Sequence, residues 1–429
     1  MKSDFFVTVY ERPAPQVKDI YFTNESFETE YNLKTDFSFL PTKNLQVDFG
    51  ASYKRIGFDY NVHAEPDTLF LYDLLTSVRK DSIIGIFRTY PAYRVDRTVS
   101  SSKNAAYAQL SYDVARPLRV TAGLRYDYFA FNNFQSVSPR IGMSYFVHPR
   151  ATLNLAYGKH YQSPAFTELA ANPVNRNLRN KYNDQVVLGL EYLLRDDIKL
   201  VLELYQKEYH DVPITQTLTT LDPYDFDDGT YVNLGAGQSR GFELFLQKKL
   251  TRHFSSILSY SHSVATNRDP RFNVDFDGDY DYRDVFTLIT GYKYDMRAKS
   301  WYRALREKRW TAAFSWLPIW PADEVELSFK FRYLGGRPYT PPAYFPQLRE
   351  WVVTEQQQLN GERYPAYHRF DFRIDRRFIF NSWNLVVFFD LVNIYNRDNI
   401  WSYQYNDDGT IEKVLQYKTL PVGGVSLEF

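Results

Sequence analysis

The sequence predicts an all-β protein, a transmembrane β-barrel of antiparallel up-and-down strands with long outer loops and short periplasmic turns. Three observations support this prediction. Apolar and polar residues alternate with a period of two along many stretches, aromatic residues make up 18% of the chain, and short connections alternate with long ones. We expect this barrel domain to occupy residues 1–429.

The stretch from Leu118 to Phe131, LRVTAGLRYDYFAF, shows the alternation clearly. Leu124 and Tyr126 share one side of an extended strand with the other apolar residues, whereas Arg119 and Arg125 fall on the opposite side. Because successive side chains of a strand point to opposite faces, one face of the predicted strand is apolar and the other is charged.

The same alternation recurs along the chain and divides it into about sixteen predicted strands. Near the C-terminus, for example, Asp371, Arg373 and Asp375 lie on one side of a strand that is mostly phenylalanine and isoleucine on the other. The predicted strands lie near residues 4–11, 26–40, 43–60, 100–115, 117–131, 135–147, 150–162, 182–195, 197–213, 230–250, 252–266, 283–295, 323–340, 363–380, 384–406 and 410–429.

The connections between these strands fall into two classes. Short turns are predicted at 41–44, 114–117, 147–150, 195–197, 250–253 and 380–383. Long polar segments are predicted at 62–100, 163–181, 214–230, 267–282 and 340–362. Short turns on one rim and long loops on the other are typical of outer-membrane barrels.

Residues 296–320 do not fit this scheme, because another strand there would move every earlier loop to the opposite rim. Trp301, Leu305 and Ala312 are spaced more as in a helix, with arginine and lysine between them. We therefore predict a basic, aromatic helical insertion over 296–320 at the periplasmic rim. An irregular strand is the alternative.

The apolar faces of the strands need a cover, and the chain has almost no helices to supply one. Lipid covers such faces in a barrel, and the charged faces then line the lumen. The 51 basic and 51 acidic residues balance, so no net charge attracts nucleic acid. The absence of cysteine excludes disulfides and thiolate chemistry.

No arrangement of residues predicts catalysis. The seven histidines are scattered, and the sequence contains neither HExxH nor GxSxG nor a glycine-rich phosphate loop. We therefore expect the protein not to be an enzyme, and we expect no cofactor other than the calcium considered next.

One predicted outer loop, FNVDFDGDYDYRD, is densely acidic. Asp275, Asp277, Asp279 and Asp281 form a candidate calcium site, because carboxylate oxygens are the ligands that this cation prefers. Phe286 occupies the position at which an EF-hand loop has glutamate. A solvated acidic loop without metal is therefore the alternative.

Aromatic residues in the long loops are candidates for ligand binding, because their flat rings suit sugars or planar chelates. The alternative is that these rings pack loop against loop or lie at the lipid boundary. The candidate residues are Tyr224, Phe226, Tyr280, Tyr282, Tyr339, Tyr344 and Trp351.

Several stretches resemble, in the same order, the C-terminal barrel of TonB-dependent outer-membrane receptors. The likeness covers roughly residues 100–429. The matching positions are Pro164, Glu168 and Leu169 in SPAFTEL, Gly241, Phe242 and Glu243 in SRGFELFLQ, Asp371 in RFDFRI, Asn393 in VVFFDLVNIYN, and Phe429 at the end of VGGVSLEF.

This resemblance implies a receptor in the outer membrane of a Gram-negative bacterium. It implies energy-coupled uptake of a scarce ligand, such as a metal chelate, a vitamin or an oligosaccharide. The implied partners are the lipid bilayer with its lipopolysaccharide, a plug domain, TonB, and the barrel-assembly machinery, which would recognise Phe429. A surface lipoprotein is a further candidate partner.

The sequence also departs from the family pattern. Such receptors carry an N-terminal plug, a TonB box and twenty-two strands, whereas this chain has no plug-like region and about sixteen predicted strands. We expect the chain to be the C-terminal portion of a receptor, and a smaller sixteen-stranded barrel is the alternative. The rival functions are a passive porin or channel and a structural or adhesive surface barrel.

Overall fold

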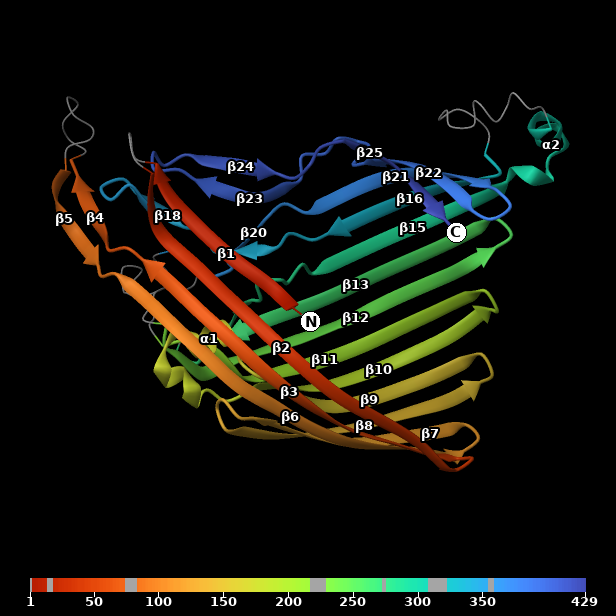
Figure 1. Cartoon of the computed structure of the whole chain (residues 1–429), viewed down its shortest axis with the longest axis horizontal. Coiled ribbons are helices and arrows are strands. Elements are labelled where there is room, and N and C mark those ends of the chain that lie inside the picture. Colours follow the sequence, from red (N-terminus) through yellow and green to blue (C-terminus); the bar gives the residue numbers. More distant parts are fainter. Residues whose placement is uncertain are drawn as a thin grey trace.

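The computed structural model describes residues 2–13, 18–73, 83–216, 229–271, 275–307, 322–353 and 359–429. A strongly curved sheet dominates the molecule (Figure 1). The sheet has 17 strands, and all but the three-residue β14 (Asp275–Asp277) are long. The long strands are β1 (Lys2–Pro13), β2 (Lys18–Thr42), β3 (Leu45–Ala64), β6 (Tyr93–Ala115), β7 (Leu118–Phe129), β8 (Phe134–His148), β9 (Ala151–Gln162), β10 (Lys181–Arg195), β11 (Ile198–Thr215), β12 (Tyr231–Thr251), β13 (Phe254–Arg268), β15 (Asp284–Asp295), β16 (Glu324–Leu334), β21 (Tyr367–Ile379), β22 (Asn384–Val392) and β25 (Leu420–Glu428).

Each long strand pairs in antiparallel orientation with the next long strand along the chain, from β1 to β25. This order is the up-and-down topology that the sequence predicts. The predicted fold class is therefore confirmed. Within the described residues, every helix is too short or too polar to span a lipid bilayer.

The two rims of the sheet differ as expected. At one rim, hairpins such as β6–β7, β8–β9 and β10–β11 turn within two residues. At the other rim the connections are long and carry their own short elements, and Figure 1 shows the β4–β5 hairpin and α1 at that end. These elements are β4 (Asp67–Tyr72), β5 (Ile83–Tyr90), α1 (Phe166–Ala171), the 3-10 helix η1 (Pro173–Asn177), β17 (Pro338–Tyr339), β18 (Ala343–Phe345), β19 (Glu350–Val352), β20 (Glu362–Arg363), β23 (Ile400–Tyr405) and β24 (Ile411–Leu415).

The two faces of the sheet separate as the alternation predicts. Leu124 and Ile141 are 55% and 52% exposed, and they lie on the convex apolar face. On the opposite face Arg125 pairs with Asp127 at 2.7 Å on the same strand. Ion pairs of this kind recur on that face, so its charges have partners within the sheet itself.

The segment after β15 contains the 3-10 helix η2 (Met296–Ala298) and α2 (Ser300–Arg306). Both lie at the rim with the short hairpins (Figure 1). Tyr302 of α2 is buried, and its hydroxyl donates to Asp323 at 3.1 Å. Residues 308–321 lie outside the described residues, and the predicted periplasmic-rim insertion over 296–320 stays a prediction.

The predicted strands 323–340, 384–406 and 410–429 are longer than the observed strands β16, β22 and β25. A close backbone contact follows β16, and a residue with positive φ follows β22. After β16, a side chain at Gly335 would approach the carbonyl oxygen of Tyr282 to 1.9 Å, and a side chain at Gly336 would approach that of Tyr364 to 1.8 Å. After β22, Asn393 adopts a positive φ of 55°. The predicted strands 384–406 and 410–429 therefore split, and the β23–β24 hairpin leaves the main sheet.

Asn393 joins the ends of three strands. It is fully buried, its backbone N–H donates to Asp371 at 2.9 Å, and its side-chain amide donates to the carbonyl of Arg397. Its own carbonyl accepts from the Thr419 hydroxyl at 2.8 Å. Asparagine tolerates a positive φ better than most residues, so both its conformation and its amide suit this position.

The C-terminal strand β25 continues the alternation to the last residue. Val425 and Leu427 are exposed on the apolar face, and Phe429 is 97% exposed. Recognition of Phe429 by the barrel-assembly machinery stays a prediction.

We expect Leu124→Arg to lower the free energy of unfolding by about 2–4 kcal/mol, because the charge would enter hydrocarbon near the middle of β7. The matched control is Gln109→Arg, which places the same side chain opposite Gly123 on the other face of the sheet. Chemical denaturation of the chain folded into lipid vesicles measures both. Equal losses for the two variants would contradict the assignment of the faces.

We expect Asn393→Ala to lower the free energy of unfolding by about 2–4 kcal/mol, because buried carbonyls lose their donor and alanine disfavours the positive φ. The control is Asn396→Ala, since Asn396 has a φ of 56° but is exposed. Denaturation in detergent micelles gives both values. A loss at position 396 as large as that at position 393 would argue against the proposed role of the buried amide.

Candidate functional site

The candidate site lies in the long loops, where three hairpins bring aromatic side chains together. The β17–β20 and β18–β19 hairpins come from the connection between β16 and β21. The β23–β24 hairpin comes from the connection between β22 and β25. Tyr339, Tyr344 and Trp351, which the sequence singles out, therefore meet partners from a second loop.

The first aromatic group consists of Tyr339, Tyr364 and Tyr403. The ring centres of Tyr339 and Tyr364 are 4.5 Å apart, and Tyr403 lies 5.0 Å from Tyr364. The Tyr339 hydroxyl donates to Glu362 at 2.6 Å. Burial and this hydrogen bond raise the pKa of Tyr339 far above its usual range, because both disfavour the ionised phenolate.

The second aromatic group consists of Tyr344, Trp351 and Tyr405. The Trp351 ring lies 5.2 Å from Tyr344 and 4.8 Å from Tyr405. The Trp351 indole donates to the carbonyl of Asn406 at 2.9 Å, and the Tyr344 hydroxyl donates to the carbonyl of Asp407. These contacts hold the β18–β19 hairpin against the β23–β24 hairpin.

Carboxylates of the acidic loop form ion pairs with arginine side chains, one of which belongs to the connection between β16 and β21. Asp281 is only 1% exposed, and its carboxylate pairs with Arg283 and Arg363, each at 2.7 Å. Arg363 also pairs with Asp277. The backbone N–H of Ala265 donates to Asp281 at 3.1 Å, so the buried carboxylate is well compensated.

The other carboxylates of this loop are also engaged. Asp275 pairs with Arg268 at 2.5 Å, and Asp279 accepts from the Asn360 amide at 2.7 Å. Across the described parts of the chain, no group of three or more histidine, aspartate or glutamate side chains is arranged to hold a metal ion. Calcium binding by Asp275, Asp277, Asp279 and Asp281 stays a prediction.

The remaining aromatic candidates have different surroundings. Tyr280 is 78% exposed at the tip of the acidic loop. Tyr282 is partly buried, and its carbonyl lies against Gly335. Tyr224 and Phe226 lie outside the described residues. The structure thus brings Tyr344 and Trp351 together and leaves Tyr280 apart, and ligand contact by any of them stays a prediction.

The loop between β9 and β10 folds onto the end of the sheet. Leu169 of α1 packs with Phe129 and Leu178 in a buried cluster, and Pro164 is fully buried. The Glu168 carboxylate accepts from the backbone N–H of Ala165 at 2.9 Å, which caps the short helix. Pro164, Glu168 and Leu169, which match the family motif, therefore stabilise the conformation of this loop against the end of the sheet.

No sequence pattern singles out Asn175, which is central to this loop. Its side chain is fully buried and donates to the carbonyls of Glu168 at 2.6 Å and Gly229 at 2.7 Å. Its side-chain oxygen accepts from the backbone N–H of Tyr231 at 2.9 Å. One amide therefore joins this loop to the next one along the rim.

The Gly-Phe-Glu motif lies inside β12 and not in a loop. A side chain at Gly241 would approach the carbonyl of His262 to 2.3 Å, so only glycine fits. The Phe242 ring lies 5.6 Å from that of Tyr260 on β13. Glu243 lies directly opposite Glu203 on the charged face.

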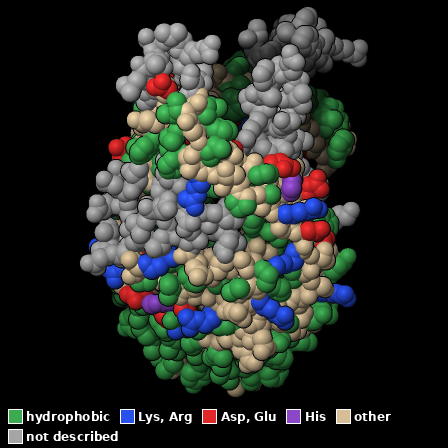
Figure 2. All heavy atoms as spheres, turned by 90° about the vertical axis from the view of Figure 1, so that its left-hand side faces the viewer, with side chains coloured by type: hydrophobic (Ala, Val, Ile, Leu, Met, Phe, Trp, Pro, Cys, Tyr) green, Lys and Arg blue, Asp and Glu red, His purple; other side chains and the backbone are tan. Residues whose placement is uncertain are grey.

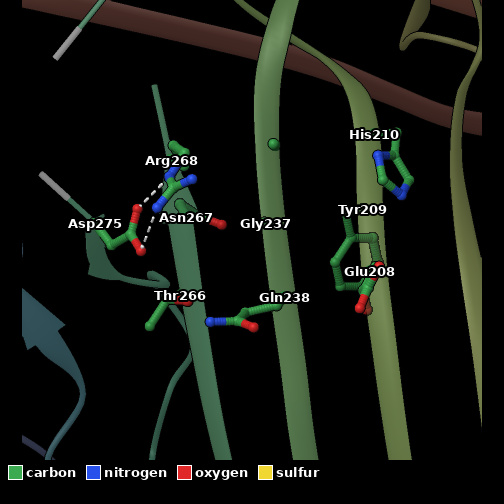
Figure 3. Close-up of a pocket in the computed structure, with 10 residues that line it drawn as sticks. Glu208, Tyr209, His210, Gly237, Gln238, Thr266, Asn267, Arg268 and Asp275 are labelled. Atoms are coloured by element: carbon green, nitrogen blue, oxygen red, sulfur yellow. Dashed lines mark hydrogen bonds and ion pairs between the residues drawn. The ribbon is translucent and has the colours of Figure 1, made fainter. Parts of the chain in front are cut away.

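A hollow of about 230 Å³ lies near the ends of β11, β12 and β13, and Figure 3 shows the residues that line it. Arg268 and Asp275 pair at one side of it, and Gln238 lies opposite Glu208. By strand alternation Glu208 and Gln238 fall on the same face as the exposed Leu204. The hollow therefore opens on the outer surface and not into the lumen.

Among the described residues, the end of the molecule that carries the long loops has no dominant charge. Figure 2 looks onto this end, where acidic and basic side chains are scattered among polar and apolar ones. An almost entirely apolar surface borders them at the bottom of the view. In the described part of this end, aromatic rings and hydrogen-bonding groups are therefore more prominent than charge of one sign.

Comparison with known proteins identifies the fold. The family described as "TonB dependent receptor-like, beta-barrel" matches residues 4–396. The structure is similar to the ferripyoverdine receptor of the Pseudomonas aeruginosa outer membrane, with a TM-score of 0.61 and 12% identity over 98% of this chain and 52% of that chain. No curated protein matches the sequence.

Two further solved structures are similar. The ferric yersiniabactin uptake receptor FyuA from Yersinia pestis has a TM-score of 0.60 and 12% identity over 98% of this chain and 56% of that chain. The copper transporter OprC has a TM-score of 0.57 and 13% identity over 95% of this chain and 57% of that chain. The chain thus spans about half the length of these proteins.

The family match covers most of the chain, and the topology, the short-turn rim and the two-faced strands agree with it. Proteins of this kind are receptors rather than enzymes, and they lie in the outer membrane of Gram-negative bacteria. This chain belongs to the TonB-dependent receptor-like β-barrel family.

Proposed function

We propose that the chain is the barrel of an outer-membrane receptor that takes up a scarce ligand through coupling to TonB. The family match over residues 4–396 is the observation that carries this proposal. The long loops would capture the ligand, and the charged inner face would surround its path. The rim with the short turns would then face the periplasm.

The ligand class that we propose is a metal complex. The similar receptors are named for ferripyoverdine and ferric yersiniabactin, and a third is named as a copper transporter. Flat aromatic rings at Tyr344, Trp351 and Tyr339 would suit the planar parts of such a chelate. The alternative ligand class is a vitamin or an oligosaccharide, which would contact the same rings.

The proposed protein partners are TonB and a plug domain inside the barrel. The inner face of β16 and β21 carries a dense set of charges, with Lys330 opposite Asp371 in the register. Arg369 pairs with Asp371 at 2.9 Å, and Arg373 pairs with Asp375 at 2.6 Å. A polar domain inside the lumen would meet this wall. A surface lipoprotein partner stays a prediction.

We expect cells that carry the native gene to accumulate radiolabelled iron from a panel of ferric siderophores, and a deletion strain to lose this uptake. Coupling to TonB uses the proton gradient, so a protonophore should stop accumulation while ligand binding to the cells persists. Uptake that continues after the gradient collapses would instead identify a passive channel. Absence of any difference between the two strains for every metal complex would reject the ligand class.

We expect Trp351→Ala to weaken binding of the transported ferric complex at least about tenfold, because the substitution removes a ring and separates two loop hairpins. The matched control is Trp383→Ala. Trp383 stacks on Phe380 at 4.2 Å at the opposite rim. Equilibrium binding of the radiolabelled complex to purified receptor measures both variants. Equal weakening by the two substitutions would show that the loop aromatics have no special part in capture.

A further inference from the structure

Ion pairs recur on the inner face of the sheet, but one sector of that face lacks them. Arg140 of β8, His160 of β9 and Lys207 of β11 form no hydrogen bond or ion pair with any other described residue. The Lys207 ammonium lies over the Tyr205 ring, 4.9 Å from its centre. We call Arg140, His160 and Lys207 the luminal basic patch.

The luminal basic patch crosses four neighbouring strands on the lumen side. Ile141 is exposed on the apolar face, so its neighbour Arg140 faces the lumen. Arg140 lies directly opposite Gly158, and Gly158 lies opposite Gln185. Gln185 in turn lies opposite Lys207. Arg140 and Lys207 therefore stand in one row, about 14 Å apart at the backbone, because neighbouring strands are about 4.8 Å apart.

The side chains of Arg140 and His160 meet above Gly158. A side chain at Gly158 would come within 2.8 Å of the His160 Nε2 and within 3.5 Å of the Arg140 Cγ. Both side chains therefore fold over this glycine, which is buried. They form one surface on the lumen wall, and Gln185 continues this surface toward Lys207.

A hollow of about 210 Å³ adjoins Arg140 on the inner face of β6, β7 and β8. Its other basic lining residues, Lys34 and Arg125, each pair with a carboxylate, at 2.8 and 2.7 Å. Gln109 and Ser138 add an amide and a hydroxyl to the lining. The hollow is thus a small concave site in which Arg140 has no carboxylate partner among the described residues.

Most carboxylates on these strands are directed away from the patch or already paired. Neither β8 nor β9 contains an acidic residue. Asp184 and Glu208 adjoin the row on β10 and β11, but they lie opposite each other on the outer face. Glu191 and Asp211 each have a basic partner, at 2.8 and 2.9 Å.

Glu203 and Glu243 are the inner-facing carboxylates that remain on β11 and β12. They lie directly opposite each other. Glu203 is four residues from Lys207 along β11, which is about 14 Å at about 3.4 Å per residue. This separation exceeds the Debye length of about 8 Å at physiological ionic strength. The luminal basic patch therefore keeps its positive charge and favours an anion.

We propose that the luminal basic patch binds anionic groups of the transported ligand, so that the receptor takes up a negatively charged metal complex. A planar guanidinium suits paired oxygens, such as those of a carboxylate or a catecholate. Arg140 and Lys207 would contact different edges of one complex as it passes along the lumen wall. This inference rests on the proposed uptake function and adds the charge of the ligand to it.

The test compares two iron complexes of similar size, an anionic ferric tricatecholate and an uncharged ferric trihydroxamate. Equilibrium dialysis measures their binding to the purified full chain in dodecyl maltoside micelles. We expect the anionic complex to bind at least about tenfold more tightly. Arg140→Gln and Lys207→Gln should each weaken its binding about tenfold, as loss of one charge-assisted contact would do, and leave binding of the uncharged complex unchanged.

The matched control is Arg240→Gln. Arg240 is exposed and lies directly opposite Gln206, the neighbour of Lys207 along β11, so it is at the same height on the outer face. This variant should bind the anionic complex as the unmodified chain does. Lys207→Arg keeps the charge and should do the same, which separates loss of charge from loss of structure.

Equal binding of the two complexes to the unmodified chain would overturn the proposal. It is also the result expected if the patch instead contacts an acidic surface of a domain inside the lumen. Equal weakening by Arg240→Gln and Lys207→Gln would overturn the proposal as well. The measurement needs neither cells nor TonB. If cells accumulate metal complexes while the chain shows no preference for the anionic one, the uptake function stands and the role of the patch falls.

Discussion

Continuous pairing of the backbone is the constraint on which the rest of this structure depends. Hydrocarbon offers no hydrogen bonds, so each N–H and C=O at membrane depth must pair with a neighbouring strand. The register of β10–β13 follows this rule, since its irregularities lie near strand ends, between Leu193 and Arg195, beyond Tyr209, and after Lys248. The middle of each strand is regular, and this regularity places the side chains in strict alternation.

The alternation in turn explains why so many charges occur on a membrane-spanning sheet. Arg125 and Asp127 are two residues apart and therefore share the inner face, as do Arg373 and Asp375. These pairs are partly exposed, and such pairs contribute little to stability. Their main effect is on the lumen wall, which stays polar and close to neutral while the outer face remains apolar.

The sequence predicted those parts of the fold that depend on neighbours along the chain. The period of two identified β7 and its two faces, because only the order of residues decides which side chain points where. It failed at Asn393, since VVFFDLVNIYN reads as one strand and the turn depends on hydrogen bonds to Arg397 and Thr419 in the folded chain. Tyr339 and Trp351 lie in the connection between β16 and β21, but their contacts with a second loop form only in the folded chain and leave no pattern in the sequence.

The loops around the candidate site are connected more closely than separate loops on a barrel rim would be. The β23–β24 hairpin packs on the β18–β19 hairpin through Trp351, and Arg363 of β20 forms an ion pair with the buried Asp281 of the acidic loop. Movement of one of these loops therefore disturbs contacts in the other two. Asn393 anchors the same assembly to Asp371 on the inner face of β21. A ligand that shifts the aromatic hairpins would consequently act on side chains that line the lumen, which is the physical link that a receptor with an internal partner requires.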